Sequence, residues 1–267
     1  MGLFGKLFDK KECDICGGEI GLLGNRKLED GNLCKHCAKK LSYWFDDRRH
    51  STVEDIRQQL AYREENSKKV EAFNITRTIG RYIKVVFDED NRKLMVVRTN
   101  DIRSENPDVI DFSQITGCDF DIDEDRSEEK RRLDDGREVS YNPPRYTWNY
   151  DFYVTIRVNH PYFDDMRFQL NSSTVYVESE GALINPGILG TILGQQQFNP
   201  RNHPDFIEYS EMGNEIKQAL VQMRQQERES TIAASTPKKP VICPMCRATT
   251  TPDSNGCCEY CGSPLNK

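Results

Sequence analysis

Features that most enzymes and membrane proteins need are scarce in this sequence. Its 267 residues include only four histidines and two tryptophans, and no apolar run is long enough to cross a bilayer. No glycine-rich loop follows a predicted strand, as phosphate binding requires, and no Ser/His/Asp set is present. The chain is polar, with a mean hydropathy of −0.74 and 30% charged residues. These absences argue against a membrane-spanning protein and against the commonest forms of catalysis.

A concentrated positive charge is also missing. The net charge of −6 is distributed as −10 over residues 71–235 and +2 at each end. Proteins that follow nucleic-acid phosphates need clustered Lys and Arg side chains to displace counterions. The charge distribution therefore argues against duplex DNA or RNA as the main partner.

Cysteine, by contrast, is abundant and regularly spaced. Eight of the ten cysteines form four CxxC pairs, two near each end: Cys13/Cys16, Cys34/Cys37, Cys243/Cys246 and Cys258/Cys261. Two such pairs supply the tetrahedral shell of four sulfurs that Zn²⁺ prefers, and separations of 17 and 11 residues suit zinc modules. Because four thiolates leave no open position for water or substrate, we predict two structural Zn²⁺ ions.

Three other roles compete for these cysteines. Iron takes the same four-sulfur shell and is the main alternative metal. A thioredoxin-like redox pair needs one CxxC at the start of a helix in a βαβ unit, which neither end shows. A disulfide framework would suit a secreted chain, but no signal peptide precedes Cys13, so we expect a cytoplasmic protein.

The N-terminal pairs belong to a predicted module over residues 1–66. A turn at Gly17-Gly18 follows the first pair, and the second pair opens a predicted helix that includes residues 38–45. This order of knuckle, hairpin, knuckle and helix resembles a treble-clef finger. A capping box at Ser51–Glu54 predicts a second helix that extends to about Glu65.

The middle of the chain, residues 67–229, predicts an antiparallel sheet followed by one helix. The expected strands, all with apolar side chains in alternation or in short runs, lie at residues 82–87, 94–99, 109–112, 118–123, 152–158, 166–170 and 174–177. A charged, proline-containing stretch between Asp123 and Trp148 is expected to be a long hairpin loop. A helix over 204–228 carries the apolar stripe, which consists of Phe206, Tyr209, Met212, Ile216, Leu220 and Met223. This α+β order resembles a bacterial pleckstrin-homology-like domain.

A short tether and a second small module complete the chain. Residues 230–240 are small, polar and flanked by proline, which is typical of a flexible linker. Residues 241–267 resemble the zinc ribbons that end many bacterial proteins. Cys257 is adjacent to Cys258, but its use as a ligand would spoil the CxxC spacing, so we exclude it.

Two apolar segments have no strand or long-helix role. Leu3, Phe4, Leu7 and Phe8 lie on one face of a short helix, and Leu183–Leu193 is the most apolar run of the chain. Either segment is explained by burial against its own module. The alternative is that at least one binds a protein partner or the surface of a membrane.

The remaining clusters of reactive side chains do not indicate catalysis. Asp119, Asp121 and Asp123 imitate a calcium loop, but Glu124 stands where that loop requires glycine. Cys118 shares its strand face with apolar side chains, so we expect a buried, inert thiol rather than a nucleophile paired with His160. We therefore expect that the protein is not an enzyme.

Residues 12–60 carry a more specific resemblance. With Cys-Asp-Ile-Cys-Gly-Gly at residues 13–18 and Trp-Phe-Asp-Asp-Arg-Arg at 44–49, the chain resembles an uncharacterised bacterial family. That family combines an N-terminal four-cysteine module, a β-rich middle and often a terminal ribbon. The resemblance implies zinc and a cytoplasmic bacterial setting. We expect a non-enzymatic adaptor or scaffold that binds another protein, and the alternative is a zinc-ribbon nucleic-acid-binding regulator.

Overall fold

The computed structural model describes residues 11–179, 198–235, 240–253 and 256–265. The chain divides into two compact units, Met1–Arg224 and Gln225–Lys267. The first unit contains both the N-terminal module and the β-rich middle, which the sequence separates at residue 66. Leu3, Phe4, Leu7 and Phe8, as well as Leu183–Leu193, lie outside the described residues. No helix in the described ranges is both long and apolar enough to span a membrane.

The N-terminal module consists of two small hairpins and one helical turn. Its elements are β1 (Lys11–Glu12), β2 (Glu19–Ile20), β3 (Arg26–Lys27), β4 (Asn32–Leu33) and α1 (Lys35–Ala38). The predicted helix over residues 38–45 is wrong, because α1 ends at Ala38. Ser42 is the physical reason, since its hydroxyl accepts from the Trp44 backbone N–H at 3.1 Å and donates to Asp108 at 2.7 Å. Such side-chain bonds compete with helical ones.

A 19-residue helix, α2 (Val53–Glu71), follows the short 3₁₀ turn η2 (Asp47–His50). Its capping box pairs Thr52 with Asp55, one residue later than the sequence predicts. The helix also continues six residues beyond the expected end at Glu65. Its buried face explains this length, because Asn66 and Val70 both contact the β-rich middle.

The first sheet of the middle is antiparallel, with neighbouring strands in chain order. It contains β5 (Arg77–Gly80), β6 (Lys84–Asp88), β7 (Lys93–Val97) and β8 (Ile110–Asp111), with α3 (Ile102–Glu105) before β8. The predicted hairpin between β6 and β7 is confirmed. The Asp88 carboxylate stabilises its turn by accepting the backbone N–H of Asn91 at 3.0 Å, and it also accepts the backbone N–H of Asn74, before β5, at 2.9 Å.

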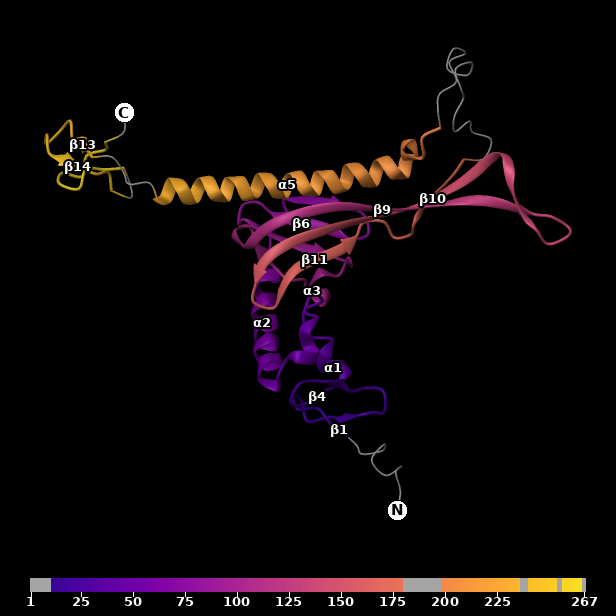
Figure 1. Cartoon of the computed structure of the whole chain (residues 1–267). Helices are drawn as coiled ribbons and strands as arrows, with labels where there is room; N and C mark the ends of the chain where they lie inside the picture. Colours follow the sequence, from indigo (N-terminus) through magenta and orange to yellow (C-terminus); the bar gives the residue numbers. More distant parts are fainter. Residues whose placement is uncertain (1–10, 180–197, 236–239, 254–255, 266–267) are drawn as a thin grey trace, which may run out of the picture. The chain divides into compact units, whose positions relative to one another are not determined.

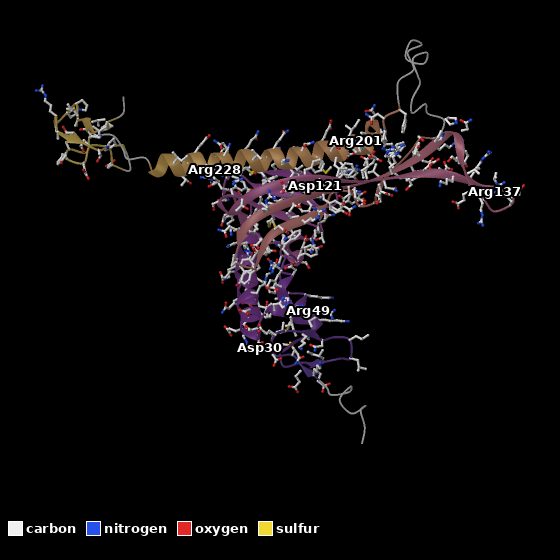
Figure 2. All side chains as sticks on the ribbon, viewed as in Figure 1. Asp30, Arg49, Asp121, Arg137, Arg201 and Arg228 are labelled. Atoms are coloured by element: carbon white, nitrogen blue, oxygen red, sulfur yellow. The ribbon has the colours of Figure 1, made fainter. Side chains whose placement is uncertain are left out.

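The second sheet is built around one very long strand. It contains β9 (Ile115–Arg132), which the 3₁₀ turn η3 (Phe112–Gln114) precedes, β10 (Glu138–His160), β11 (Phe163–Gln169) and β12 (Val175–Glu178). β10 pairs with β9 on one side and with β11 and β12 on the other. Figure 1 shows β9 and β10 continuing past β11 as a two-stranded ribbon, with Arg137 near its tip in Figure 2.

This ribbon corrects the expected loop between Asp123 and Trp148. Most of that stretch is strand, because its backbone groups pair across the hairpin in register from Glu124–Tyr150 to Arg132–Glu138, with one irregularity. Side chains on both faces are mostly polar, so the stretch has no hydrophobic period to reveal a strand. Arg126 adds a cation–π contact, with its guanidinium carbon 3.9 Å from the centroid of the Tyr146 ring.

The helix α5 (Pro204–Ser235) follows another 3₁₀ turn, η4 (Pro200–Asn202). Its predicted apolar stripe is confirmed, since five of the six residues are buried and Met212 packs partly buried against the same core. Side chains from both sheets and from α5 form this single core. Gly213 allows close approach, because a Cβ there would stand 2.2 Å from the Phe120 ring. The predicted α+β class, with antiparallel sheets and two small cysteine clusters, is confirmed.

The C-terminal part differs from the sequence-based expectation at its start. α5 continues to Ser235 rather than ending at Arg228, so residues 230–235 are helical and not an extended tether. The second small module then contains β13 (Val241–Ile242) paired with β14 (Thr249–Thr250). Two isolated bridges, Pro252–Cys258 and Cys257–Pro264, close its remaining loop.

Candidate metal centres

The four N-terminal cysteines predicted as ligands come together in one group. Their sulfur atoms all lie within 4.8 Å of one another, and Cys16 Sγ is 3.8 Å from Cys34 Sγ. Cys13 and Cys37 are buried, whereas Cys16 is exposed. The group therefore lies at the edge of the small core that the module shares with α2.

Local backbone geometry places each sulfur. Gly17 donates its N–H to the Cys13 carbonyl at 2.7 Å, and it has a φ of +70° that favours glycine. Cys34 is the N-cap residue of α1. The helix begins directly after it and places Cys37 in the first helical turn. Backbone N–H groups also point at sulfur: Cys34 N donates to Cys13 Sγ at 3.3 Å, and Cys37 N donates to Cys34 Sγ at 3.4 Å.

The four C-terminal cysteines form a second group. Cys243 Sγ is 3.6 Å from Cys261 Sγ, and Cys246 Sγ is 3.6 Å from Cys258 Sγ. The residue after each CxxC of this group has a positive φ, 59° at Arg247 and 69° at Gly262, as Gly17 has after the first N-terminal pair. Each donates its N–H to the carbonyl of the first cysteine of its pair at 2.8 Å.

These distances fit one metal ion in each group. Four sulfurs at about 2.3 Å from a tetrahedral Zn²⁺ are about 3.8 Å apart. Sulfur–sulfur distances of 3.6 to 3.8 Å in the two groups match that value, and all these cysteines are free thiols. A disulfide would bring two sulfurs to about 2.05 Å. Each group can therefore hold one metal ion, and the geometry is consistent with zinc.

The thiols in each group do not ionise alike. Burial raises the pKa of Cys13, but backbone N–H groups of Cys34, Cys16 and Ile15 outweigh it and lower that pKa to about 6. Burial and the neighbouring sulfurs raise the pKa of Cys37. In the second group, hydrogen bonds from Ser263 lower the pKa of Cys261 to about 6. A dication would remove the mutual repulsion that opposes ionisation of all four thiols.

The two cysteines outside the four CxxC pairs, Cys118 and Cys257, lie outside both groups. The backbone N–H of Cys257 donates to the Asp253 carboxylate at 2.8 Å, and its sulfur is not part of the second group. Cys118 is buried on β9, and burial followed by the charge of Asp119 raises its pKa to about 11. A thiol with so high a pKa is a poor nucleophile.

Two carboxylates on the acidic face of β9 form ion pairs. Asp119 pairs with Arg157, and Asp121 lies 3.9 Å from Arg167 on the neighbouring strands. His160 does not meet Cys118 as a base, because its ring stacks on Phe163 with centroids 4.1 Å apart.

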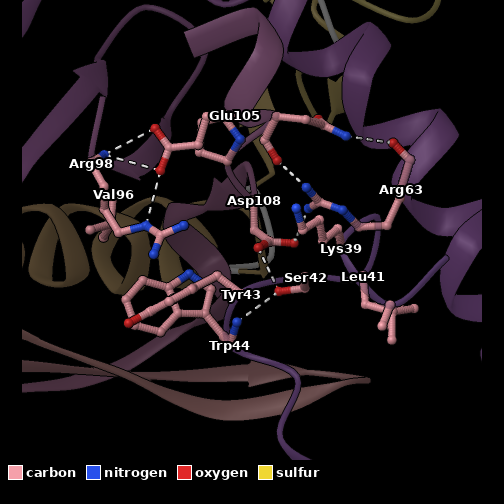
Figure 3. Close-up of a pocket in the computed structure, with 13 residues that line it drawn as sticks. Lys39, Leu41, Ser42, Tyr43, Trp44, Arg63, Val96, Arg98, Glu105 and Asp108 are labelled. Atoms are coloured by element: carbon pink, nitrogen blue, oxygen red, sulfur yellow. Dashed lines mark hydrogen bonds and ion pairs between the residues drawn. The ribbon is translucent and has the colours of Figure 1, made fainter. Parts of the chain in front are cut away.

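Sequence reasoning missed a buried polar cluster between the first module and the first sheet. Arg63 Nη1 lies 2.8 Å from Asp108 Oδ1, and the side chains are only 8% and 2% exposed. Ser42 Oγ and Tyr62 Oη donate to the same carboxylate at 2.7 and 3.0 Å. Figure 3 shows Arg63, Ser42 and Asp108 converging beside a pocket of about 220 Å³. The sequence signal that could have revealed this cluster is the set of polar residues Gln59, Arg63 and Asn66, which lie on the buried face of α2.

Comparison with known proteins supports one part of the chain. Residues 11–59 match the model of a domain of unknown function, DUF4428. The match covers the first cysteine group and the beginning of α2. No curated protein and no solved structure matches the chain.

His160 gives a testable pH dependence. It is 8% exposed, and its pKa is lowered by burial and then by Lys69 and Arg63, while Asp108 opposes the shift. Below pH ~6.5 the unfolded chain therefore binds a proton that the folded chain does not. The stabilising contribution is complete above that pH and is lost as the pH falls toward the folded-state pKa, by at most about 1.4 kcal/mol per pH unit.

The test is urea unfolding of the wild type and of His160→Phe between pH 7.5 and 5, a range of about two units around the histidine pKa. The variant keeps the stacking but has no titratable ring, so its stability should fall less with acidification. Parallel pH profiles would contradict the prediction.

Gln59 presents an unusual buried amide on α2. The side chain is fully buried, and within the described residues neither Oε1 nor Nε2 has a hydrogen-bond partner. Gln59→Met should raise the free energy of unfolding by about 1–3 kcal/mol, because it removes unsatisfied polar atoms at similar volume. Chemical denaturation measures the change. Gln58→Met, at an exposed neighbour, is the matched control, and an equal response of both variants would refute the explanation.

Proposed function

We propose that the protein holds two structural Zn²⁺ ions, one in each cysteine group. The closed four-sulfur geometry supports this assignment, since neither group leaves a position for substrate. Each module has too small a core to fold alone, so metal binding would supply its folding free energy. Elemental analysis of the purified full chain should give two zinc ions per chain. Iron, or fewer than two ions after reconstitution, would contradict the assignment.

We further propose a non-enzymatic adaptor that binds another protein. The observation that carries this proposal is the exposure of apolar side chains around the second cysteine group. Ile242, Met245 and Tyr260 are 70%, 76% and 71% exposed. Tyrosine and methionine are enriched in protein interfaces, and isolated modules this small rarely display so much apolar surface without a partner.

Proximity makes these side chains one surface. Ile242 immediately precedes Cys243, and Met245 and Tyr260 each precede a cysteine of the same group. Because the four sulfurs lie within 4.8 Å of one another, the adjoining residues are confined to a small module surface. We call Ile242, Met245 and Tyr260 the knuckle surface. A bound metal would make this surface rigid and so lower the entropy lost on binding.

The adaptor proposal is tested with the knuckle surface itself. Affinity capture with the full zinc-loaded chain should retain specific proteins that are lost with Ile242→Ser/Met245→Ser/Tyr260→Ser. Metal content must remain at two ions per chain, which separates loss of binding from loss of folding. A matched control is Ile207→Ser/Val221→Ser, which removes two exposed apolar side chains from α5. An unchanged set of captured proteins would refute the proposal.

The proposal also includes the fold of the middle, the cellular setting and the two apolar segments. The middle resembles a pleckstrin-homology-like domain in its element order of two antiparallel sheets followed by one helix. A cytoplasmic setting agrees with ten free thiols, since reducing compartments maintain them. Contact through Leu3, Phe4, Leu7 and Phe8 or through Leu183–Leu193 is still proposed. Ile188→Asp/Leu189→Asp tests it, and a soluble variant that keeps its partner would contradict a role for that segment.

A nucleic-acid-binding regulator is the second candidate. The observation that favours it is a cationic groove on the first module, lined by Arg26, Lys27, Arg48 and Arg49. Binding to random DNA that weakens linearly with the logarithm of salt concentration would support this candidate. We rank it second because the chain as a whole has a net charge of −6.

A further inference from the structure

An exposed apolar turn projects from the first module between β2 and β3. Gly24 donates its N–H to the carbonyl of Gly21 at 2.8 Å, so Leu22 and Leu23 occupy the two central positions. Their side chains are 79% and 86% exposed. Turns normally use Gly, Pro, Asn, Asp or Ser at these positions, and polar residues would serve the fold equally well. The two leucines therefore contribute almost nothing to the module's core.

A cationic groove begins two residues after this turn. Arg26, Lys27, Arg48 and Arg49 line a groove of about 590 Å³ together with Asn25, Leu28 and Glu29. Two of the cations come from β3 and two from η2, and Figure 2 labels Arg49 on the surface of this module. We call these four residues the cationic groove.

The charges in the groove are crowded rather than neutralised. In the described parts of the chain, no carboxylate forms an ion pair with any of the four cations. Arg48 instead donates to the backbone carbonyl of Lys27 at 2.9 Å. Burial, and then repulsion from Arg26 and Arg49, lowers the pKa of Arg48. Such crowding favours binding of an anion from outside.

We propose that the Leu22–Leu23 turn and the cationic groove together bind the surface of an anionic lipid bilayer. The Cα atoms of Gly24 and Arg26 are at most about 7 Å apart, so the turn and the first cation of the groove are close neighbours. Leucine side chains enter the boundary between headgroups and acyl chains, while Arg and Lys bind lipid phosphates and carboxylates. The Leu22–Leu23 turn would therefore meet the acyl boundary, while the adjacent cationic groove would meet the anionic headgroups.

Lipid explains both features, whereas nucleic acid explains only one. Single-stranded nucleic acid is held by aromatic stacking beside cations, and no aromatic side chain lines this groove. Exposed leucines give no comparable contact to a base or a phosphate. The acidic remainder of the chain would also repel an extended polyanion, while a bilayer meets the module at its tip only.

This inference deepens the proposed membrane-peripheral contact and assigns it to described residues. It rests on the proposed function in one respect, which is that metal maintains the fold of the first module. Metal content is therefore measured for every sample. Loss of metal would count against the zinc proposal, whereas full metal content without lipid binding would count against this inference.

The experiment is cosedimentation of the full zinc-loaded chain with vesicles. One set is phosphatidylcholine alone and the other contains about 30% phosphatidylserine, a composition that gives a negative surface potential. We expect binding only to the anionic vesicles. Arg48→Gln/Arg49→Gln should weaken binding about 25-fold at low salt, given about fivefold for each charge near the surface. Leu22→Ser/Leu23→Ser should weaken binding at low and high salt alike.

Matched controls remove the same groups elsewhere. Arg131→Gln/Arg132→Gln removes two exposed charges from β9, and Ile207→Ser/Val221→Ser removes two exposed apolar side chains from α5. Both controls should bind like the wild type. The inference is overturned if the wild type does not bind anionic vesicles, or if the groove and turn variants bind as well as the controls. Tighter binding of a random 30-nucleotide DNA than of vesicles, lost with Arg48→Gln/Arg49→Gln, would instead assign the groove to nucleic acid.

Discussion

Cys13→Ser should unfold the N-terminal module and lower the zinc content of the chain from two ions to one. Structural zinc contributes about 10–16 kcal/mol to the folding of small zinc modules, and serine does not replace a thiolate ligand. The module's core is small, and Cys13 and Cys37 are themselves part of it. Elemental analysis and limited proteolysis measure the two effects. The circular-dichroism signal of the sheets should persist, because their core is separate from the module.

Cys257→Ser is the matched control, since this thiol lies outside the second group. It should leave two zinc ions per chain and an unchanged proteolysis pattern. If Cys13→Ser retains two ions, or if Cys257→Ser loses one, the ligand assignment is wrong. Acidification should act like the mutation on both groups, because protons compete with metal for the thiolates.

Arg63→Met should destabilise the first compact unit by about 3–5 kcal/mol, because it leaves a buried charge without its partner. Asp108 is 2% exposed, and Arg63 also donates to the backbone carbonyl of Asn106. The same carboxylate accepts from Tyr62, whose pKa is raised by burial first and then by Asp108. Urea unfolding followed by tryptophan fluorescence reports the loss through Trp44, which packs against the sheet core.

The double variant Arg63→Met/Asp108→Leu should recover much of that stability, because it removes both charges together. Arg57→Met is the control, since its pairing with Glu54 at 3.5 Å is largely exposed and its loss should change stability by less than about 1 kcal/mol. A cost for Arg63→Met no greater than for Arg57→Met would contradict a stabilising role for the buried pair.

Periodic apolar patterns made much of the fold predictable. The stripe of α5 and the β6–β7 hairpin follow directly from spacings of 3.6 and 2 residues. The cysteine groups were predictable for a different reason, because CxxC spacing constrains where two sulfurs can point. In each case the spacing of residues along the sequence is enough to determine the local geometry.

The features that escaped prediction depend on contacts between distant residues. The extension of β9 and β10 is stabilised by pairing, while its side chains are polar on both faces. α1 ends early because Ser42 bonds to Asp108, which lies 66 residues further along the chain. The cationic groove likewise combines β3 with η2, so neither segment alone appears basic enough to notice.

The long ribbon has a consequence for how this protein behaves at high concentration. β9 is an edge strand of 18 residues, and its outer backbone groups have no ladder partner in the described sheet. Such an edge is a template on which a second chain can add, leading to filaments. From Asp123 to Arg132 only Ser127 is uncharged. A second strand that paired with this edge would therefore have to lie beside closely spaced charged side chains. The ribbon's charges thus act as a barrier to polymerisation, and neutralising them should shorten the lag before aggregation.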